Sequence, residues 1–257
     1  MGNPQKQTHN LRLSGRVALI TGASSGIGAA TALSMAREGA SVLLVARRRD
    51  RMEELVSNIR AEGLHASFIC ADITVDEDVK KIFKEVQQAH GRLDILVNNA
   101  GIMLLSPVRE ANLADWRKMI DLNLFSLMFM TQSALPLMKH DGTGHIVNVA
   151  SVAGRVANPG SSGYAATKFG VVGFSESLRR EVYKDNIRVT VVESGIVATE
   201  LVTHITHPEM KAGVQGRLET TETLQAEDIA AAILYAVTQP SRVNVNEILV
   251  RPTSQER

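Results

Sequence analysis

The sequence predicts an α/β fold of the doubly wound kind, in which helices cover both faces of a seven-stranded parallel sheet. Short runs rich in Val, Ile and Leu recur along the chain, and enough residues separate them for crossover helices. The runs do not strictly alternate apolar with polar residues, as is typical of strands covered on both faces. The predicted strands are residues 16–21, 41–46, 65–70, 93–99, 145–150, 187–193 and 246–250.

Composition predicts one soluble domain with a small-molecule ligand. The chain has 257 residues, a net charge of +1 and 44% hydrophobic residues, so it can bury a sizeable core and has no basic field for nucleic acid. Cys70 is the only cysteine, which excludes an internal disulfide and favours a reducing compartment, the cytoplasm. Residues 1–14 are expected to be a flexible leader without a signal peptide, and residues 15–257 the domain.

No membrane span is expected. The richest apolar run, residues 122–138, contains Asn123, Thr131 and Pro136 and is too polar to cross a bilayer. We expect a long helix there, whose Met119, Met128, Met130 and Met138 pack in the core. Because this helix is apolar on nearly all sides, one side is expected to face the sheet and the other a second subunit.

A glycine-rich segment, TGASSGIG at residues 21–28, connects the first predicted strand to a helix. Free backbone N–H groups at a helix start bind phosphate, and glycines let a pyrophosphate approach them closely. The spacing G-x-x-x-G-x-G of Gly22, Gly26 and Gly28 differs from the common dinucleotide fingerprint G-x-G-x-x-G. The segment therefore favours a Rossmann-type nucleotide site, while a tight turn without a ligand is the alternative.

Two arginines follow the second predicted strand, where an acidic residue would bind the 2′-hydroxyl of NAD. Arg47 and Arg48 can instead hold the 2′-phosphate of NADP through guanidinium hydrogen bonds. A solvated charge run that opens the next helix is the alternative. Together with the glycine-rich segment, the pair predicts that the chain prefers NADP(H).

A tyrosine and a lysine stand four residues apart in GYAATKFG, so on a helix Tyr164 and Lys168 share one face. Tyrosine has a pKa near 10, and lowering it by about 3 units takes roughly 4 kcal/mol of stabilisation of the phenolate. A nearby ammonium and a cationic nicotinamide can supply it. Ser151 follows the fifth predicted strand and can hydrogen-bond a substrate oxygen while Tyr164 transfers the proton. Alone, the pair is a weak signal and is more typical of a helix surface than of a catalytic site.

These motifs together resemble the short-chain dehydrogenase/reductase family from about Arg16 onward: TGASSGIG, NNAG at residues 98–101, Asn123, Ser151, and Tyr164 with Lys168. The resemblance implies that Tyr164 is the acid/base, that Ser151 positions the carbonyl and that Lys168 binds ribose and perturbs Tyr164. It also implies that Asn123 holds a water in a proton relay and that the protein is a homotetramer. The residues then expected to bind NADP(H) are Gly22, Ser24, Ser25, Gly26, Ile27, Gly28, Arg47, Arg48, Asp72, Ile73, Asn99, Ala100, Gly101, Tyr164, Lys168, Val197 and Thr199.

The chain departs from the family pattern after the sixth strand, where Ser194-Gly195 replaces the usual Pro-Gly. Serine leaves this loop freer, because proline fixes φ and lacks an N–H. Residues 194–223 lack clear periodicity and are expected to form a substrate loop. His204 and His207 lack a third ligand, so no metal site is expected.

The expected function is transfer of hydride between NADP(H) and a small aldehyde, ketone or secondary alcohol. Local resemblances to family members that reduce aldehydes and to others that oxidise 3-hydroxy acids leave the substrate open. A 3-oxoacyl-carrier-protein reductase is a further alternative. A non-catalytic NADP-binding sensor or scaffold is the rival from another class, because a fold does not fix a function. The four residues Asn123, Ser151, Tyr164 and Lys168 argue against it.

Overall fold

The computed structural model describes residues 11–138 and 141–256, and its centre is a seven-stranded, all-parallel sheet of the Rossmann-like type in the order β3-β2-β1-β4-β5-β6-β7. The strands are β1 Val17–Thr21, β2 Ser41–Ala46, β3 Ala66–Cys70, β4 Ile95–Asn98, β5 His145–Val149, β6 Arg188–Ser194 and β7 Glu247–Val250. The predicted fold class and all seven predicted strands are confirmed.

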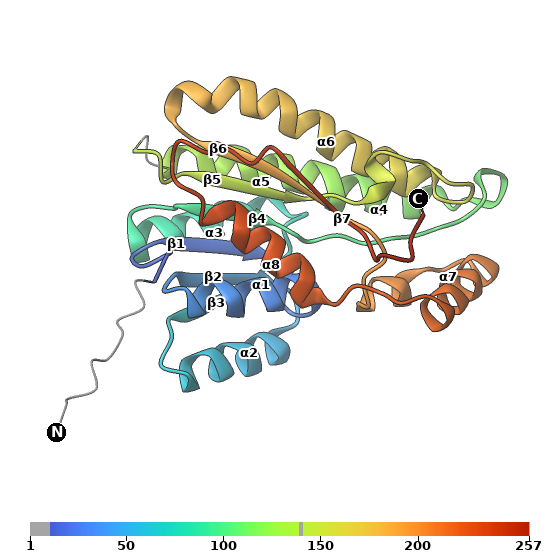
Figure 1. Cartoon of the computed structure of the whole chain (residues 1–257), viewed down its shortest axis with the longest axis horizontal. Helices are drawn as coiled ribbons and strands as arrows, with labels where there is room; N and C mark the ends of the chain where they lie inside the picture. The colour runs from blue at the N-terminus through green and yellow to red at the C-terminus, as the bar shows by residue number, and fades with distance from the viewer. Residues whose placement is uncertain (1–10, 139–140, 257) are drawn as a thin grey trace.

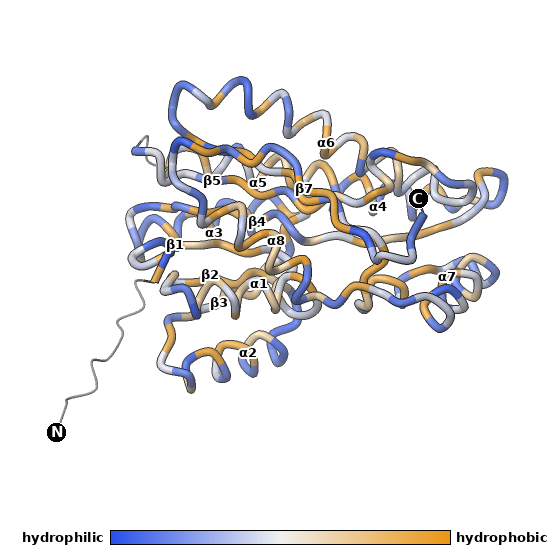
Figure 2. Tube along the Cα trace, viewed as in Figure 1, coloured by the Kyte–Doolittle hydropathy of each residue, from blue (hydrophilic) through white to orange (hydrophobic). Residues whose placement is uncertain are grey.

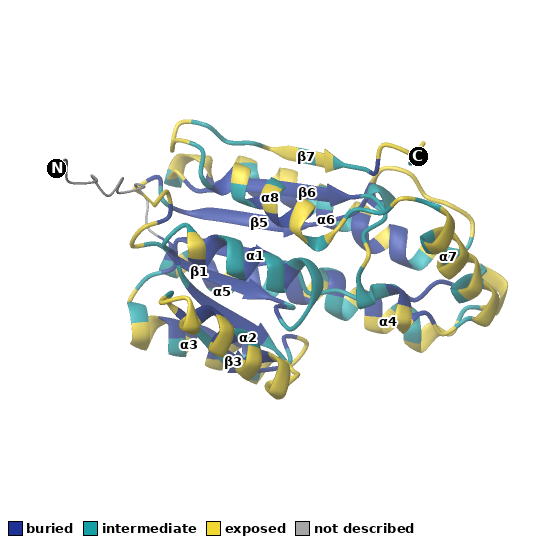
Figure 3. Ribbon diagram, turned by 60° about the horizontal axis from the view of Figure 1, so that its bottom comes forward, coloured by how far each residue is buried: buried dark blue, intermediate teal, exposed yellow. Residues whose placement is uncertain are grey.

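Helices cover both faces of the sheet (Figure 1). The helices are α1 Gly26–Arg37, α2 Arg49–Ala61, α3 Asp76–His90, α4 Leu113–Ile120, α5 Ser126–Ala134, α6 Ser162–Val182, α7 Pro208–Thr220 and α8 Ala226–Val237. One hydrophobic core joins the sheet to α1, α2 and α8, and a second joins its other face to α3, α5 and α6. Apolar segments accordingly follow the strands in Figure 2, and Figure 3 shows β1, β5 and β6 as buried.

The strand order reverses between β1 and β4, and this reversal positions the site. β1 pairs with β2 on one side and with β4 on the other, so the segments that follow β1 and β4 separate toward opposite halves of the sheet. Ligands of open α/β sheets bind at this point, outside the carboxyl ends of the strands.

The long helix expected around residues 119–138 is present, but it contains one wide turn. α4 ends at Ile120, one wide helical turn spans Asp121–Phe125, and α5 follows from Ser126. Met119, Met130 and Met138 are buried as expected, but the prediction was wrong for Met128, which is 39% exposed. It lies on the side of α5 turned away from the sheet, where periodicity alone cannot distinguish an outward apolar residue from a core residue.

The structure moves one predicted boundary and adds helical elements to one predicted loop. The predicted leader lies mostly outside the described residues, but Leu13 is buried and its N–H donates to the Glu38 carbonyl at 2.9 Å, so the packed domain begins before residue 15. The predicted substrate loop contains a short 3-10 turn, Glu200–His204, and α7. None of α7 is fully buried, since it packs its Met210, Val214 and Leu218 only partly against a small apolar cluster.

Candidate active site

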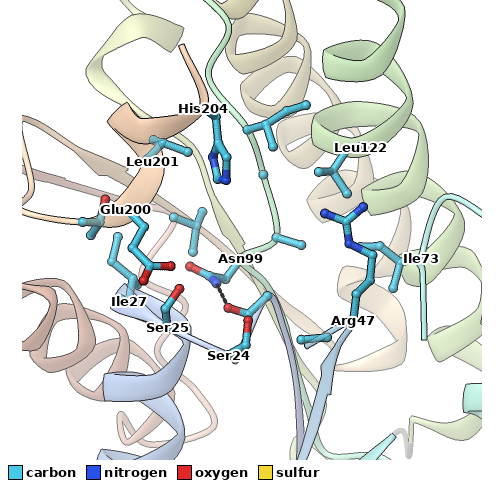
Figure 4. Close-up of a pocket in the computed structure, with 18 of the residues that line it drawn as sticks. Ser24, Ser25, Ile27, Arg47, Ile73, Asn99, Leu122, Glu200, Leu201 and His204 are labelled. Atoms are coloured by element: carbon cyan, nitrogen blue, oxygen red, sulfur yellow. Dashed lines mark hydrogen bonds between the residues drawn. The ribbon is translucent and has the colours of Figure 1, made fainter. Parts of the chain in front are cut away.

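A cleft opens at the carboxyl ends of the strands, around the strand-order reversal (Figure 4). Fifteen of the predicted coenzyme residues line it: Gly22, Ser24, Ser25, Gly26, Ile27, Arg47, Arg48, Asp72, Ile73, Asn99, Ala100, Gly101, Tyr164, Lys168 and Thr199. Gly28 and Val197, and the predicted catalytic residues Asn123 and Ser151, lie outside this lining. The sheet topology therefore brings most of the predicted site residues together from distant parts of the chain.

The glycine-rich segment follows β1 and packs closely against the residues that follow β4. Gly22 has φ +65°, and a Cβ there would lie 2.7 Å from the Ala100 Cα, so only glycine fits both the conformation and the space. Thr21 ties the two strand ends together, since its Oγ1 accepts from the N–H groups of Asn99 and Ala100 at 3.0 and 3.1 Å. This close approach fixes the entrance of α1 beside β4.

The start of α1 suits a phosphate group. Ser25 is the N-cap residue in an extended conformation, its side chain makes no capping hydrogen bond, and the first turn of α1 contains no acidic residue. The first N–H groups of a helix lack partners within the helix and lie at the positive end of its dipole. Because Gly26, at φ +53°, lines the cleft at this point, the residues present fit the pyrophosphate of a dinucleotide.

Arg48 extends from the end of β2 across the glycine-rich segment. Its Nε and one terminal nitrogen donate to Ser24 Oγ at 3.0 and 2.8 Å, and the same terminal nitrogen donates to Ser25 Oγ at 2.7 Å. Its other terminal nitrogen pairs with Glu200 at 2.7 Å. The guanidinium therefore lies between two serine hydroxyls and the Glu200 carboxylate, at the end of the cleft where the sequence places the adenosine half of a dinucleotide.

Arg47 is more exposed than Arg48, with 70% of its side chain accessible, and it pairs with Asp72 at 3.5 Å. Burial alone would raise the pKa of Asp72, but hydrogen bonds from Thr74 and the nearby Arg47 hold that pKa below its ordinary value. Asp72 therefore stays ionised and can accept hydrogen bonds at the rim. Cys70 is only partly buried, and its thiol donates to the Arg47 carbonyl.

Tyr164 and Lys168 lie one turn apart near the start of α6, and both are buried. The Lys168 ammonium donates to the Val149 carbonyl at 2.9 Å, at the end of β5, and lies 5.7 Å from the centre of the Tyr164 ring. The Ser151 hydroxyl lies beside the Tyr164 phenol and favours its ionised form. The three residues named from the sequence therefore form one cluster, with Tyr164 and Lys168 facing the cleft.

Burial dominates the ionisation of this cluster. It raises the pKa of Tyr164 to about 12, and the hydrogen bond from Ser151 opposes this rise. It also lowers the pKa of Lys168 to about 8. The sequence predicts a lowered pKa for Tyr164, whereas in the protein alone burial of the phenol raises that pKa. The Lys168 ammonium donates to the Val149 carbonyl instead of to the phenol. The cationic nicotinamide that entered the prediction is a separate contribution.

Asn123 is buried in the wide turn Asp121–Phe125, and turns of this kind are frequent at functional sites. Its Oδ1 accepts from the Ile102 N–H at 2.8 Å, while its Nδ2 donates to the Ile102 carbonyl at 2.9 Å and to Thr167 Oγ1 at 3.2 Å. Asn123 thereby holds the segment after β4 against α6, behind Lys168. The structure shows how the residue is positioned; its predicted role in a proton relay stays a prediction.

The segment after β6 borders the catalytic cluster. Ser194 is the last residue of β6, and its carbonyl accepts a long hydrogen bond of 3.4 Å from Ser151. Gln255 accepts from the Ile196 N–H at 2.9 Å and lies against Gly195, where a Cβ would come within 2.3 Å of the Gln255 side chain. Val197 forms an isolated bridge with Leu224 and does not line the cleft, whereas Thr199, two residues further on, does.

The cleft also contains residues that the sequence did not single out as coenzyme or catalytic residues: Ile102, Leu122, Ser194, Glu200, Leu201 and His204. Ile102, Leu122 and Leu201 give its wall an apolar character. Thr21 was also missed, although its place directly before Gly22 is a usable signal for a strand-end hydroxyl.

His207 pairs with Glu110 at 3.0 Å, away from His204. Among residues 11–138 and 141–256, no group of three or more His, Cys, Asp or Glu side chains could hold a metal ion, and no helix is long and apolar enough to span a membrane.

A dinucleotide cleft with a buried tyrosine, lysine and serine defines the class of a nicotinamide-dependent oxidoreductase. A sequence model of the short chain dehydrogenases matches residues 16–210. An uncharacterized oxidoreductase of Staphylococcus saprophyticus is 37% identical over 242 residues, which cover 93% of this chain and 97% of that protein. A similar oxidoreductase of Staphylococcus aureus is 35% identical, over 93% and 98% of the two chains.

The similar solved structures are also dehydrogenases or oxidoreductases, and three of them contain NADP or a derivative of it. The closed form of serine dehydrogenase complexed with NADP+ has a TM-score of 0.85 at 31% identity, over 94% of this chain and 96% of the other. A metagenomic short-chain oxidoreductase in complex with NADP has a TM-score of 0.80 at 30% identity, over 95% and 100%. An alcohol dehydrogenase of Thermococcus sibiricus complexed with 5-hydroxy-NADP has a TM-score of 0.83 at 27% identity, over 94% and 98%.

The chain belongs to the short-chain dehydrogenase/reductase family. It is therefore an NAD(P)-dependent oxidoreductase.

Proposed function

We propose that this protein is an NADP(H)-dependent reductase of small aldehydes or ketones, which also oxidises the corresponding secondary or primary alcohols. The observation that carries the proposal is the buried cluster of Ser151, Tyr164 and Lys168 at one end of a cleft whose other end presents Arg47 and Arg48. When bound there, the nicotinamide supplies or accepts the hydride.

The residues of the chain then perform the proton chemistry. The Ser151 hydroxyl holds the substrate oxygen beside the Tyr164 phenol, and Tyr164 gives its proton to that oxygen during reduction. Lys168, fixed by the Val149 carbonyl, favours the phenolate left behind and has further N–H donors for ribose hydroxyls. Asn123 holds the backbone of Ile102, next to Gly101, and so maintains the cleft wall facing Lys168.

The coenzyme preference follows from charge. Arg47 and Arg48 offer guanidinium donors to a 2′-phosphate, and no aspartate or glutamate directly follows β2 to bind a ribose 2′-hydroxyl. The structural relatives that contain NADP are consistent with this preference.

The apolar wall formed by Ile102, Leu122 and Leu201 favours an uncharged, apolar group on the carbonyl carbon. Locally, residues 98–108, 204–207 and 245–253 resemble the aldehyde reductase of clavulanic acid biosynthesis, which also reduces a carbonyl group. An assay of NADPH consumption with aldehydes, ketones and β-keto esters tests the proposal. Turnover of at least one substrate class is expected; binding of NADPH without turnover of any would instead support a sensor or scaffold.

We also propose a homotetramer. Apolar side chains are exposed on α4, α5 and the turn between them, with Leu113 at 72%, Phe125 at 56% and Met128 at 39%, and Phe169 on the adjacent α6 is 46% exposed. A patch of this kind on packed helices is typical of an interface between copies. Sedimentation of the protein and of a Phe125→Glu variant tests this: the variant is expected to form smaller oligomers, and a monomeric parent protein would contradict the proposal.

A further inference from the structure

Glu200 links the substrate-loop region to the adenosine end of the cleft. It begins the 3-10 turn Glu200–His204 directly after Thr199, far from β2 in sequence. Its carboxylate nevertheless pairs with Arg48 and with Arg51, each at 2.7 Å. Figure 4 shows the Glu200 side chain directed toward Ser25 at the edge of the cleft.

These ion pairs are not a requirement of the fold. The side chains of Glu200 and Arg48 are 40% and 43% exposed, and exposed ion pairs typically contribute about 0–1 kcal/mol to stability. Hydrogen bonds from Arg48 and then from Arg51 nevertheless lower the pKa of Glu200 to about 2, so the carboxylate is ionised throughout the neutral range. A fixed negative charge therefore lies among the groups that suit an anion.

Each of the three nitrogens of the Arg48 guanidinium donates to an oxygen atom. Two of its nitrogens donate to Ser24 and Ser25, whose hydroxyls can bind the same phosphate as Arg48. The third nitrogen donates to Glu200. A phosphate of charge near −2 that binds this guanidinium meets the Glu200 carboxylate within a few ångströms. Like charges at such a distance repel, and salt weakens the repulsion.

We infer that Glu200 reduces the preference for the phosphorylated coenzyme by competing with the 2′-phosphate for Arg48. The inference rests on the proposed use of NADP(H). The carboxylate weakens binding of the phosphorylated dinucleotide and leaves binding of the unphosphorylated form almost unchanged, so it moderates a preference that Arg47 and Arg48 create. Arg51 gives Glu200 a second partner, to which it stays paired when the phosphate occupies Arg48.

Binding of the adenosine halves alone tests this without any turnover. The probes are 2′,5′-ADP, which has the phosphate, and 5′-AMP, which lacks it; calorimetry measures the affinity of each for the parent protein and for Glu200→Gln. The matched control is Glu219→Gln, which removes the same charge from α7 at a position outside the cleft lining. A low and a high salt concentration are compared.

The expected result is that Glu200→Gln binds 2′,5′-ADP about tenfold more tightly at low salt, binds 5′-AMP as before, and loses most of the gain at high salt, while Glu219→Gln behaves like the parent. Unchanged or weaker binding of 2′,5′-ADP by Glu200→Gln, with a parent that prefers 2′,5′-ADP to 5′-AMP, overturns the role of Glu200 alone. If neither the parent nor Glu200→Gln distinguishes the two probes, both this role and the proposed coenzyme are overturned.

Discussion

The Lys168 ammonium lies 5.7 Å from the centre of the Tyr164 ring and is held there by the Val149 carbonyl. The lysine therefore acts on the tyrosine through its charge rather than through a direct hydrogen bond. Both side chains are buried, and burial disfavours the charged form of each. The proton chemistry of the site accordingly depends on charges that arrive with its ligands.

The pH dependence of stability tests the burial of Lys168. Because the folded pKa is about 8 and the ordinary value is 10.5, the unfolded state binds more protons between these pH values, and the free energy of unfolding contributed by Lys168 rises with pH. Tyr164 acts in the opposite sense between about pH 10 and 12, where the folded state retains its proton. Urea unfolding from pH 7.5 to 9.5 therefore isolates Lys168.

Relative to Lys168→Met, the parent protein is expected to gain on the order of 2 kcal/mol across this range. If the two proteins show parallel stability curves, Lys168 does not titrate from a buried position and the electrostatic account of the site is wrong.

Replacement of Arg47 by Asp tests the coenzyme preference. Loss of a charge-assisted hydrogen bond to phosphate costs about 1.5–3 kcal/mol, so KM for NADPH is expected to rise roughly 10- to 100-fold while KM for NADH changes little. The control is Arg49→Asp, because Arg49 pairs with Glu53 within α2 and does not line the cleft. A parent protein that uses NADPH and NADH with equal efficiency would contradict the preference.

Ser194→Pro tests the one departure from the family pattern. Ser194 ends β6 and its carbonyl, which proline keeps, accepts from Ser151. Proline restricts the unfolded chain, so the variant is expected to be more stable by about 0.4–1 kcal/mol, with Tm higher by roughly 1–4 °C. A stiffer loop is also expected to change KM for a bulky ketone more than KM for NADPH. A lower Tm would mean that the native loop needs the serine N–H or its φ.

The sequence predicts the sheet well because each strand is a buried apolar run and the topology of such sheets is restricted. It also predicts the contents of the cleft, since Gly22, Arg48 and Asn99 all follow strands whose carboxyl ends meet at one edge. Local pattern and fold agree at these positions.

Other features depend on tertiary contacts that no local pattern contains. The pairing of Glu200 with Arg48 joins residues 152 positions apart, and the burial that raises the pKa of Tyr164 comes from the whole site. The wide turn around Asn123 interrupts a segment whose composition favours a continuous helix, and α7 lacks the apolar periodicity that would have predicted it.

The most direct test of the central claim is the rate of NADPH oxidation by Tyr164→Phe with a carbonyl substrate that the parent reduces. Tyr183→Phe is the matched control, because Tyr183 is 60% exposed and lies at the end of α6 away from the cleft. Loss of the phenolic proton is expected to lower the rate by about 10²–10⁴-fold, with NADPH affinity unchanged by fluorescence titration and the control fully active. Retention of the parent rate by Tyr164→Phe would show that another group transfers the proton.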